Sequence, residues 1–202
     1  MLKVTTIDLM RHGEVEGGNR FRGSTDDPLT KHGWQQMQDT LEPGGDWTQV
    51  ISSPLQRCAK FSASWSNNQN LTHSLNKSFQ EMHFGDWEGK TADEISAKDP
   101  AALKEFWQDP NKFAPKNSEL LSDFRQRILD AWCNLIHDHH GEHILLVSHG
   151  GPIRMILSHI LEIPEHAILR LEVPHASISR IKIYHASGEP DSASLVFHAG
   201  SL

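Results

Sequence analysis

The chain has little cysteine, no excess of positive charge and no long apolar run. Its two cysteines, Cys58 and Cys133, lie far apart, so the sequence indicates no disulfide framework. This usage favours a reducing compartment, and we expect a cytoplasmic protein. No segment approaches the roughly 20 apolar residues of a membrane-spanning helix, so we expect no membrane association. The first residues form no basic segment followed by an apolar core, so no secretory leader is expected.

Positive charge is in the minority. The 19 lysines and arginines face 26 acidic residues, which gives a formal net charge of −7. Such a protein is a poor partner for nucleic acid, and if it binds an anion it must gather its cations in a small pocket. No repeat, linker or low-complexity segment divides the sequence. The length suits one sizeable domain, and we expect residues 1–202 to form a single one.

Two predicted strands are buried, and each ends in a histidine followed by glycine. The first covers residues 3–10 and leads into Arg-His-Gly-Glu at 11–14; the second covers 144–147 and leads into Ser-His-Gly-Gly at 148–151. Ligands bind at the carboxyl ends of strands in open α/β sheets. We therefore expect His12 and His149 to meet at one site, where the amide of Gly150 can donate to an anion at a helix start.

The other elements follow from apolar periodicity and from capping residues. Helices are expected over residues 30–41, 54–65, 91–97, 103–107, 118–136 and 152–160. Further strands are expected over residues 48–51, 71–75, 167–173, 176–184 and 194–198.

Additional candidate site residues follow the strand ends. Arg11 offers a planar fork of donors that fits phosphate. Arg57 falls in the first turn of a predicted helix, where a cation is misplaced unless an anion compensates it. Asn19 lies in the polar loop after the first strand and is either a ligand or a solvated loop residue. His175, which follows a proline, is a weaker candidate for the same site.

Two carboxyl groups, Glu81 and Glu88, flank an aromatic-rich turn. Burial near Phe and Trp can raise the pKa of a carboxyl group, which suits a general acid. The histidine-rich segment 137–143 spans a helix end and a strand start, so its imidazoles need not converge, and we interpret it as structural or solvated rather than as a metal site.

Together these residues are an inventory for phosphoryl transfer through a covalent phosphohistidine. His12 would be the nucleophile, and Arg11, Arg57 and His149 would hold the three non-bridging oxygens. Glu81 would protonate the leaving oxygen and then deprotonate the attacking water. No metal or other cofactor is expected, because the guanidinium groups supply the positive charge.

Five motifs resemble, in order, those of the phosphoglycerate-mutase-like group of the histidine phosphatase superfamily. They are Leu9-Met-Arg-His-Gly-Glu14, Pro28-Leu-Thr30, Ser52-Ser-Pro-Leu-Gln-Arg57, Glu81-Met-His-Phe-Gly-Asp-Trp-Glu-Gly89 and Val147-Ser-His-Gly-Gly151. The resemblance implies a three-layer α/β/α sandwich with a mostly parallel central sheet, and the same catalytic roles. The short chain and the Phe-Gly-Asp-Trp-Glu-Gly segment resemble the bacterial alpha-ribazole phosphatase branch, which removes the 5′-phosphate of alpha-ribazole phosphate in cobalamin biosynthesis.

The loop after the first strand departs from the family pattern. Val15 stands where Thr or Ser is usual, and Gly18 stands where Asn is usual, unless Asn19 takes that role in a shortened loop. Arg22 replaces the Ser or Thr that commonly precedes the residue matching Gly23. Phosphate contacts from this loop are therefore left open by the sequence.

The residues and the resemblance leave more than one function open. A phosphatase acting on a small phosphorylated metabolite is favoured over a phosphoglycerate mutase, because mutases carry longer insertions around the site. A broad-specificity sugar or nucleotide phosphatase and a non-catalytic phosphate-binding protein are also compatible with the sequence. The helices at 91–108 and the loop at 109–117 are expected to line the alcohol side, and the sequence does not decide the oligomeric state.

Overall fold

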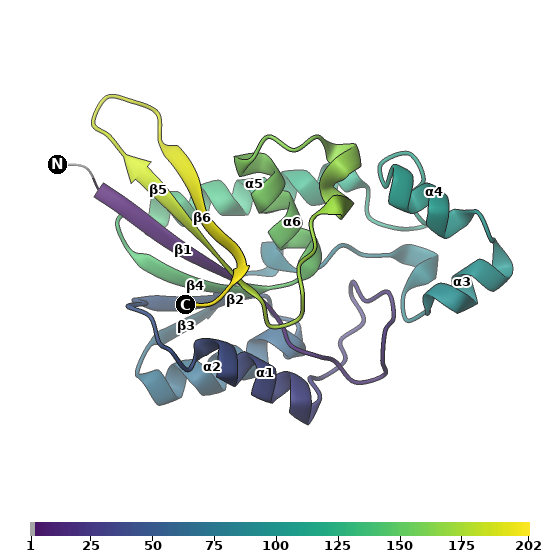
Figure 1. The fold of residues 1–202 in the computed structure, drawn as a ribbon, viewed down its shortest axis with the longest axis horizontal. Coiled ribbons are helices and arrows are strands. Elements are labelled where there is room, and N and C mark those ends of the chain that lie inside the picture. The colour runs from purple at the N-terminus through teal and green to yellow at the C-terminus, as the bar shows by residue number, and fades with distance from the viewer. Residues whose placement is uncertain (1–2) are drawn as a thin grey trace.

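The sheet is built around two strands whose residues are apolar on both faces. A computed structural model, which describes residues 3–202, places β1 (Lys3–Arg11) beside β4 (His143–Ser148) at its centre (Figure 1). Ile7 and Leu9 point to one core cluster, while Met10 points to the cluster on the opposite face. Burial on both faces explains the continuous apolar run of β4, whereas β1 also buries the polar residues Thr5 and Asp8.

The sheet has six strands in the order β3-β2-β4-β1-β5-β6. β2 (Gln49–Ser52) and β3 (Thr72–Leu75) extend the parallel part on one side. β5 (Ile178–His185) and β6 (Ser192–Gly200) add an antiparallel edge on the other side. The prediction of a mostly parallel sheet is confirmed.

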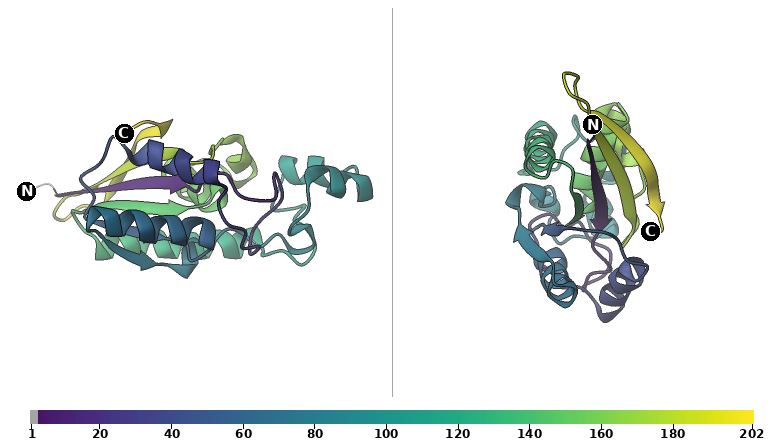
Figure 2. Two further views of the ribbon diagram at one scale, coloured as in Figure 1. Left: turned by 90° about the horizontal axis from the view of Figure 1, so that it is seen from below. Right: turned by 90° about the vertical axis from the view of Figure 1, so that its left-hand side faces the viewer.

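Helices cover both faces of this sheet. α1 (Lys31–Leu41) and α2 (Gln56–Gln69) pack on one face, and α5 (Leu121–Asp138) and α6 (Gly150–Ile160) pack on the other (Figure 2). The predicted three-layer sandwich is therefore confirmed. α3 (Ala92–Lys98) and α4 (Ala102–Gln108) project beyond the carboxyl ends of the parallel strands (Figures 1 and 2).

Capping residues set several helix starts. Thr30 caps α1 by accepting a hydrogen bond from the amide of Gly33, as predicted, and Thr91 forms a capping box with Glu94 at the start of α3. Several boundaries differ from expectation by a few residues. The helix expected over 54–65 is Gln56–Gln69, the helix expected from residue 118 begins at Leu121, and the helix expected from residue 152 begins at Gly150. The strands expected over 176–184 and 194–198 are Ile178–His185 and Ser192–Gly200.

The strand predicted over residues 167–173 is wrong. The segment forms a short 3₁₀ helix, Glu165–Arg170, followed by an extended end. Its backbone groups bond locally, through the amide of Ala167 to the carbonyl of Pro164 and the amide of Leu171 to that of Ile168. The apolar alternation arises because Ile168 and Val173 enter the core while the residues between them are more exposed. None of the helices within residues 3–202 combines the length and apolar character that a bilayer crossing requires.

Candidate active site

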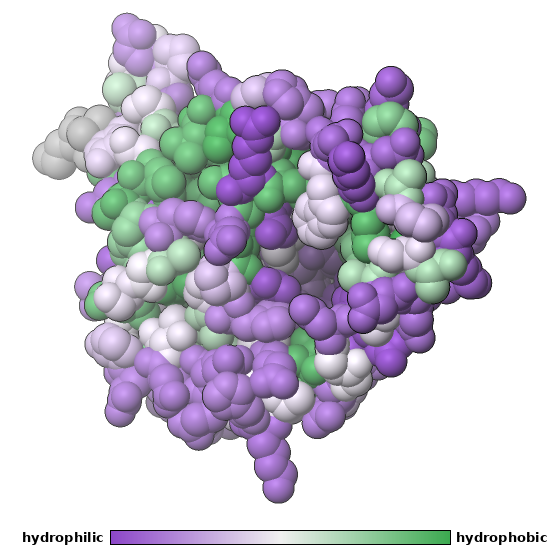
Figure 3. Space-filling model, turned by 45° about the vertical axis from the view of Figure 1, so that its right-hand side comes forward, coloured by the Kyte–Doolittle hydropathy of each residue, from purple (hydrophilic) through white to green (hydrophobic). Residues whose placement is uncertain are grey.

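A cavity of about 440 Å³ opens at the carboxyl ends of β1 and β4. Figure 3 shows the molecule turned toward this end, where its surface is hollowed. The cavity brings together four of the predicted site residues, Arg11, His12, Glu81 and Gly150, and Asn19 lies at its exposed rim. The full lining is Arg11, His12, Glu14, Val15, Gly18, Asn19, Arg20, Phe21, Arg22, Glu81, Phe84, Trp107, Gly150, Arg154 and His175.

His12 is a buried imidazole with one nitrogen fixed and the other available. Nδ1 lies 2.8 Å from the carbonyl oxygen of Gly13, which can only accept, so Nδ1 carries the proton. No group within residues 3–202 bonds to Nε2, which therefore presents its lone pair. Burial, followed by the charges of Arg57 and Arg11, holds the pKa of His12 well below its ordinary value. The ring is thus neutral at physiological pH.

His149 lies beside it, with 5.2 Å between the two ring centroids. Its Nδ1 accepts a hydrogen bond of 3.2 Å from Nε of Arg57, and because arginine only donates, the proton of His149 is on Nε2. Nε2 donates to Oγ of Ser53 at 2.7 Å. Burial and the charge of Arg57 hold the pKa of His149 well below 6.5. Both nitrogens bond to the protein here, so the predicted contact of His149 with phosphate stays a prediction.

Arg57 is buried behind the histidines and does not line the cavity. Its Nη1 donates to the carbonyl of Thr25 at 2.7 Å, and its Nη2 donates to the carbonyls of Arg22 and Gly23 at 3.3 and 3.1 Å. These bonds leave one N–H of Arg57 Nη1 without an acceptor among residues 3–202. Arg57 therefore holds the loop 22–25 and places a positive charge next to both imidazoles.

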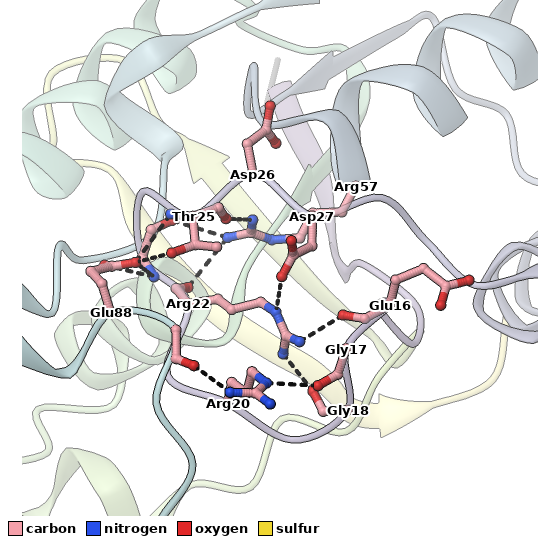
Figure 4. A network of polar contacts seen from close by, with 12 residues as sticks. Glu16, Gly17, Gly18, Arg20, Arg22, Thr25, Asp26, Asp27, Arg57 and Glu88 are labelled. Atoms are coloured by element: carbon pink, nitrogen blue, oxygen red, sulfur yellow. Dashed lines mark hydrogen bonds and ion pairs between the residues drawn. The ribbon is translucent and has the colours of Figure 1, made fainter. Parts of the chain in front are cut away.

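Glu88 holds the same loop from its other side (Figure 4). Its carboxylate accepts hydrogen bonds from the amides of Gly23, Ser24, Thr25 and Phe84 and from the hydroxyl of Thr25. Burial raises the pKa of Glu88, but the bond from the Thr25 hydroxyl and those from the amides outweigh it, so the pKa is lowered. The raised pKa expected from the aromatic neighbours is wrong for Glu88. A Cβ on Gly23 would lie 1.9 Å from the carbonyl oxygen of Met82, so only glycine permits this approach.

The two arginines of the loop are used to hold it in shape. Arg22 pairs with Asp27 at 2.6 Å and donates to the carbonyls of Gly18 and Glu16 (Figure 4). Arg20 likewise donates to loop carbonyls. The Arg22 that departs from the family pattern is thus an organiser of the loop, a role that the sequence did not reveal.

Arg11, at the end of β1, bonds to the segment 173–175. It donates from Nη1 to the carbonyl of Val173 at 2.6 Å and from Nη2 to Nε2 of His175 at 2.9 Å. Its Nε is buried and finds no partner among residues 3–202. The ring of His175 lies 5.6 Å from that of His12, and burial, then the charge of Arg11, lowers the pKa of His175 to about 4. His175 therefore belongs to the site.

Glu81 lines the cavity from the segment that follows β3, and its carboxylate contacts the start of α6. Its Oε2 accepts from the amide of Gly151 at 3.0 Å, and its Oε1 accepts from the amide of Met82 at 2.9 Å. A Cβ on Gly151 would lie 2.0 Å from Oε1 of Glu81, so the second glycine of the motif makes room for the carboxylate. Arg154 was missed by sequence reasoning; its guanidinium lies against Gly150 in the same cavity.

Of the helices at 91–108 and the loop at 109–117, which the sequence predicts on the alcohol side, only α4 lines this cavity, through Trp107. In contrast, α3 and residues 112–116 of the loop line a separate one. In the histidine-rich segment, His143 bonds to the buried Asp8 and His139 bonds to Glu142, so these imidazoles diverge. Residues 3–202 contain no cluster of three or more side chains suited to hold a metal ion.

A family model described as histidine phosphatase superfamily (branch 1) matches residues 7–194. The chain belongs to this superfamily. It is 27% identical to the adenosylcobalamin/alpha-ribazole phosphatase of Escherichia coli K12 over 164 residues, which cover 79% of the chain and 81% of that protein. It is 26% identical to the glucosyl-3-phosphoglycerate phosphatase of Mycolicibacterium vanbaalenii over 174 residues, which cover 81% of the chain and 77% of that protein.

The superfamily fold is also seen in the solved structure of Bacillus stearothermophilus YhfR. That structure superposes with a TM-score of 0.83 at 29% identity and covers 97% of this chain and 100% of its own. Mycobacterial relatives that are 30% identical over 171 residues are longer, and the chain matches only 47% of their length.

Proposed function

We propose that this histidine phosphatase superfamily member is a metal-independent phosphomonoesterase that acts through a phosphohistidine. The observation that carries the proposal is the state of His12, a neutral imidazole whose Nε2 faces a cationic cavity while Nδ1–H is held by a carbonyl. Family membership and the phosphatases among the relatives support the reaction class.

The geometry supports the following steps. Nε2 of His12 attacks phosphorus, and the bond between phosphorus and the alcohol oxygen breaks. Glu81, as the carboxylic acid, gives its proton to the leaving oxygen. Glu81 then takes a proton from water, whose oxygen attacks the phosphohistidine, and the bond between phosphorus and Nε2 breaks to release inorganic phosphate.

The positive charge needed by these steps comes from two arginines in different positions. Arg11 has an unpaired buried Nε and would bind a phosphate oxygen directly. Arg57 has most of its donors bound to loop carbonyls, and it would stabilise the spreading negative charge from behind the histidines with its remaining proton. His149 would act beside it, and Asn19 would contribute from the rim.

The substrate is proposed to be a small phosphorylated metabolite. Alpha-ribazole 5′-phosphate in cobalamin biosynthesis is one candidate, and a sugar phosphate such as the substrate named for the glucosyl-3-phosphoglycerate phosphatases is another. A panel that includes both, with 3-phosphoglycerate and its bisphosphate, separates these from a mutase, because a mutase forms an isomer and a phosphatase releases inorganic phosphate. The available nucleophile on His12 argues against a binding protein without catalysis.

The decisive experiment is labelling of His12. Rapid quench with a ³²P-labelled substrate should trap an acid-labile phosphate on the wild type and none on His12→Ala, whose turnover should be lost. His137→Ala, which removes an imidazole from an exposed position, should behave as the wild type. EDTA should leave the rate unchanged. Near-normal turnover by His12→Ala, or strict dependence on an added metal, would overturn the mechanism.

We likewise propose that residues 1–202 fold as one domain and that the protein acts in the cytoplasm. The length of the chain and its two unpaired cysteines support these two points.

A further inference from the structure

The cavity has two chemically different parts. At the ends of β1 and β4 it is lined by cationic and polar groups around His12, and its lining also includes the aromatic rings of Phe21, Phe84 and Trp107. We call this second part the outer part, because Trp107 lies on α4, which projects beyond those strand ends (Figure 1). Trp107 is 52% exposed, although its neighbour Phe106 is buried. A large indole that is exposed to solvent and lines a cavity indicates a ligand-binding surface, because covering exposed aromatic surface with a ligand releases a large hydrophobic free energy.

The aromatic part is held firmly in place. The ring of Phe21 packs edge-to-face on Phe84 with 5.3 Å between centroids, and on Trp87 with 5.1 Å. Trp87 packs on Phe106 at 5.3 Å, and Phe106 packs on Trp107 at 5.7 Å. The rings thus form a continuous cluster that joins α4 to the loop after β1. A surface of this kind is preformed, so a ligand that stacks on it need not order it first.

The cations in the outer part are already neutralised or bound. Arg22 is paired with Asp27 and donates to two carbonyls, and Arg20 donates to two carbonyls and lies 3.5 Å from Glu94. In Figure 4 the Arg20 and Arg22 guanidinium groups point at these loop oxygens. Glu14 adds a negative charge to the lining, and Arg154 lies at the phosphate end beside Gly150. Among residues 3–202, the cations that line the outer part are thus already engaged by carboxylate or carbonyl oxygens, which weakens their attraction for a second anionic group of a substrate.

We propose that this site selects phosphate monoesters of a neutral alcohol that carries a planar apolar group, and that Trp107 and Phe84 bind this group by stacking. Alcohols that bear a carboxylate or a second phosphate are disfavoured. The inference rests on the proposed phosphatase function and names the substrate class for it. Two kinds of substrate appear in the names of the relatives. The inference favours alpha-ribazole 5′-phosphate, whose alcohol is a nucleoside with a neutral planar base, over glucosyl-3-phosphoglycerate, whose alcohol carries a carboxylate.

The test compares substrates that differ only in the alcohol. For the wild type, kcat/KM should be higher for 1-naphthyl phosphate than for glycerol 2-phosphate, and lowest for 3-phosphoglycerate. Trp107→Ala should lower the ratio of kcat/KM for 1-naphthyl phosphate to that for glycerol 2-phosphate by about tenfold, and Trp107→Phe should keep most of it. Phe113→Ala, which removes a ring from the neighbouring cavity, is the matched control and should not change the ratio.

A binding measurement separates this inference from the proposed function. In His12→Ala, which cannot turn over, calorimetry should show that 1-naphthylphosphonate binds more tightly than methylphosphonate, and Trp107→Ala should remove the difference. If the wild type turns over and carries the phosphate label on His12 but shows no preference for the naphthyl group, only the inference is overturned. If the protein prefers the naphthyl ligand but shows neither turnover nor label, only the proposed function is overturned. A wild type that prefers 3-phosphoglycerate, or a ratio that Trp107→Ala leaves unchanged, would also overturn the inference.

Discussion

Replacing Glu88 by Gln should weaken both the fold and the chemistry, although the side chain does not line the cavity. The Glu88 carboxylate accepts bonds from four amides and one hydroxyl, contributed by Gly23, Ser24, Thr25 and Phe84. A glutamine keeps one acceptor oxygen but turns an NH₂ group toward amides that can only donate. The Thr25 amide would lose its partner if the NH₂ group replaces Oε2, and the amides of Ser24 and Phe84 would lose theirs if it replaces Oε1, while the bonds that remain would no longer go to a charged acceptor.

The expected size follows from these lost bonds. Hydrogen bonds to a charged acceptor contribute roughly 1.5–3 kcal/mol each, and because Glu88 is half-buried, water recovers part of that, so we expect a loss of about 2–4 kcal/mol. For a chain of this length that corresponds to a fall in Tm of roughly 4–16 °C. The loop 22–25 also binds Arg57, so its displacement should lower kcat by roughly tenfold to a hundredfold.

The pH dependence supplies an independent check on Glu88. Because the folded-state pKa is lower than the ordinary value of 4.5, its contribution is fully present above pH 4.5 and is lost as the pH falls below that value. Thermal melts of wild type and Glu88→Gln should thus differ most at neutral pH and converge in acid. Asp93→Asn removes the same charge from an exposed position on α3 and is the control. If Glu88→Gln matches that control in Tm and kcat at pH 7.5, the carboxylate does not hold the loop.

Two further predictions concern the imidazoles and the glycine beside Glu81. His12 and His149 are buried and their pKa values are lowered, so below pH 6.5 each takes up a proton in the unfolded chain but not in the folded one. The free energy of unfolding should therefore fall below pH 6.5, by about 1.4 kcal/mol per pH unit for each histidine. Urea denaturation at pH 7.5 and 5.5 measures this, and equal stability at the two values would contradict it. Gly151→Ala would place a Cβ 2.0 Å from Oε1 of Glu81 and displace this carboxylate. In steady-state assays kcat should fall by roughly a hundredfold with little change in KM. An unchanged kcat would show that catalysis does not depend on the present position of the Glu81 carboxylate.

The centre of the sheet could be predicted because its signals are local. Continuous apolar runs identify buried parallel strands, and the glycine after each histidine marks where the chain turns from the sheet. The carboxyl ends of parallel strands share one edge, so the sequence alone could bring His12, His149 and Arg11 together. The apolar and aromatic neighbours of Glu81 in the sequence favour it as the acid, and the family resemblance supports the same role.

The remainder depends on contacts between distant segments. Glu88 meets residues 63 to 65 positions away, and the loop that it binds has no periodicity that would reveal its shape. The orientation of Arg57 toward loop carbonyls, rather than toward the cavity, follows from that shape as well. The strand prediction fails at residues 167–173 because a short 3₁₀ turn followed by an extended end buries apolar residues at irregular intervals, which imitates a strand.

The pairing of β1 with β4 has a consequence for how this protein can vary. Arg11 lies opposite Ser148, and the amide of His12 bonds to the carbonyl of Ser148 at 3.0 Å, so the two imidazoles emerge side by side from adjacent strands. A single inserted or deleted residue in either strand would shift one ring by about 3.3 Å and turn it to the opposite face of the sheet. Lengthening the chain is therefore tolerable in the hairpin between β5 and β6 but not upstream of either histidine within its strand.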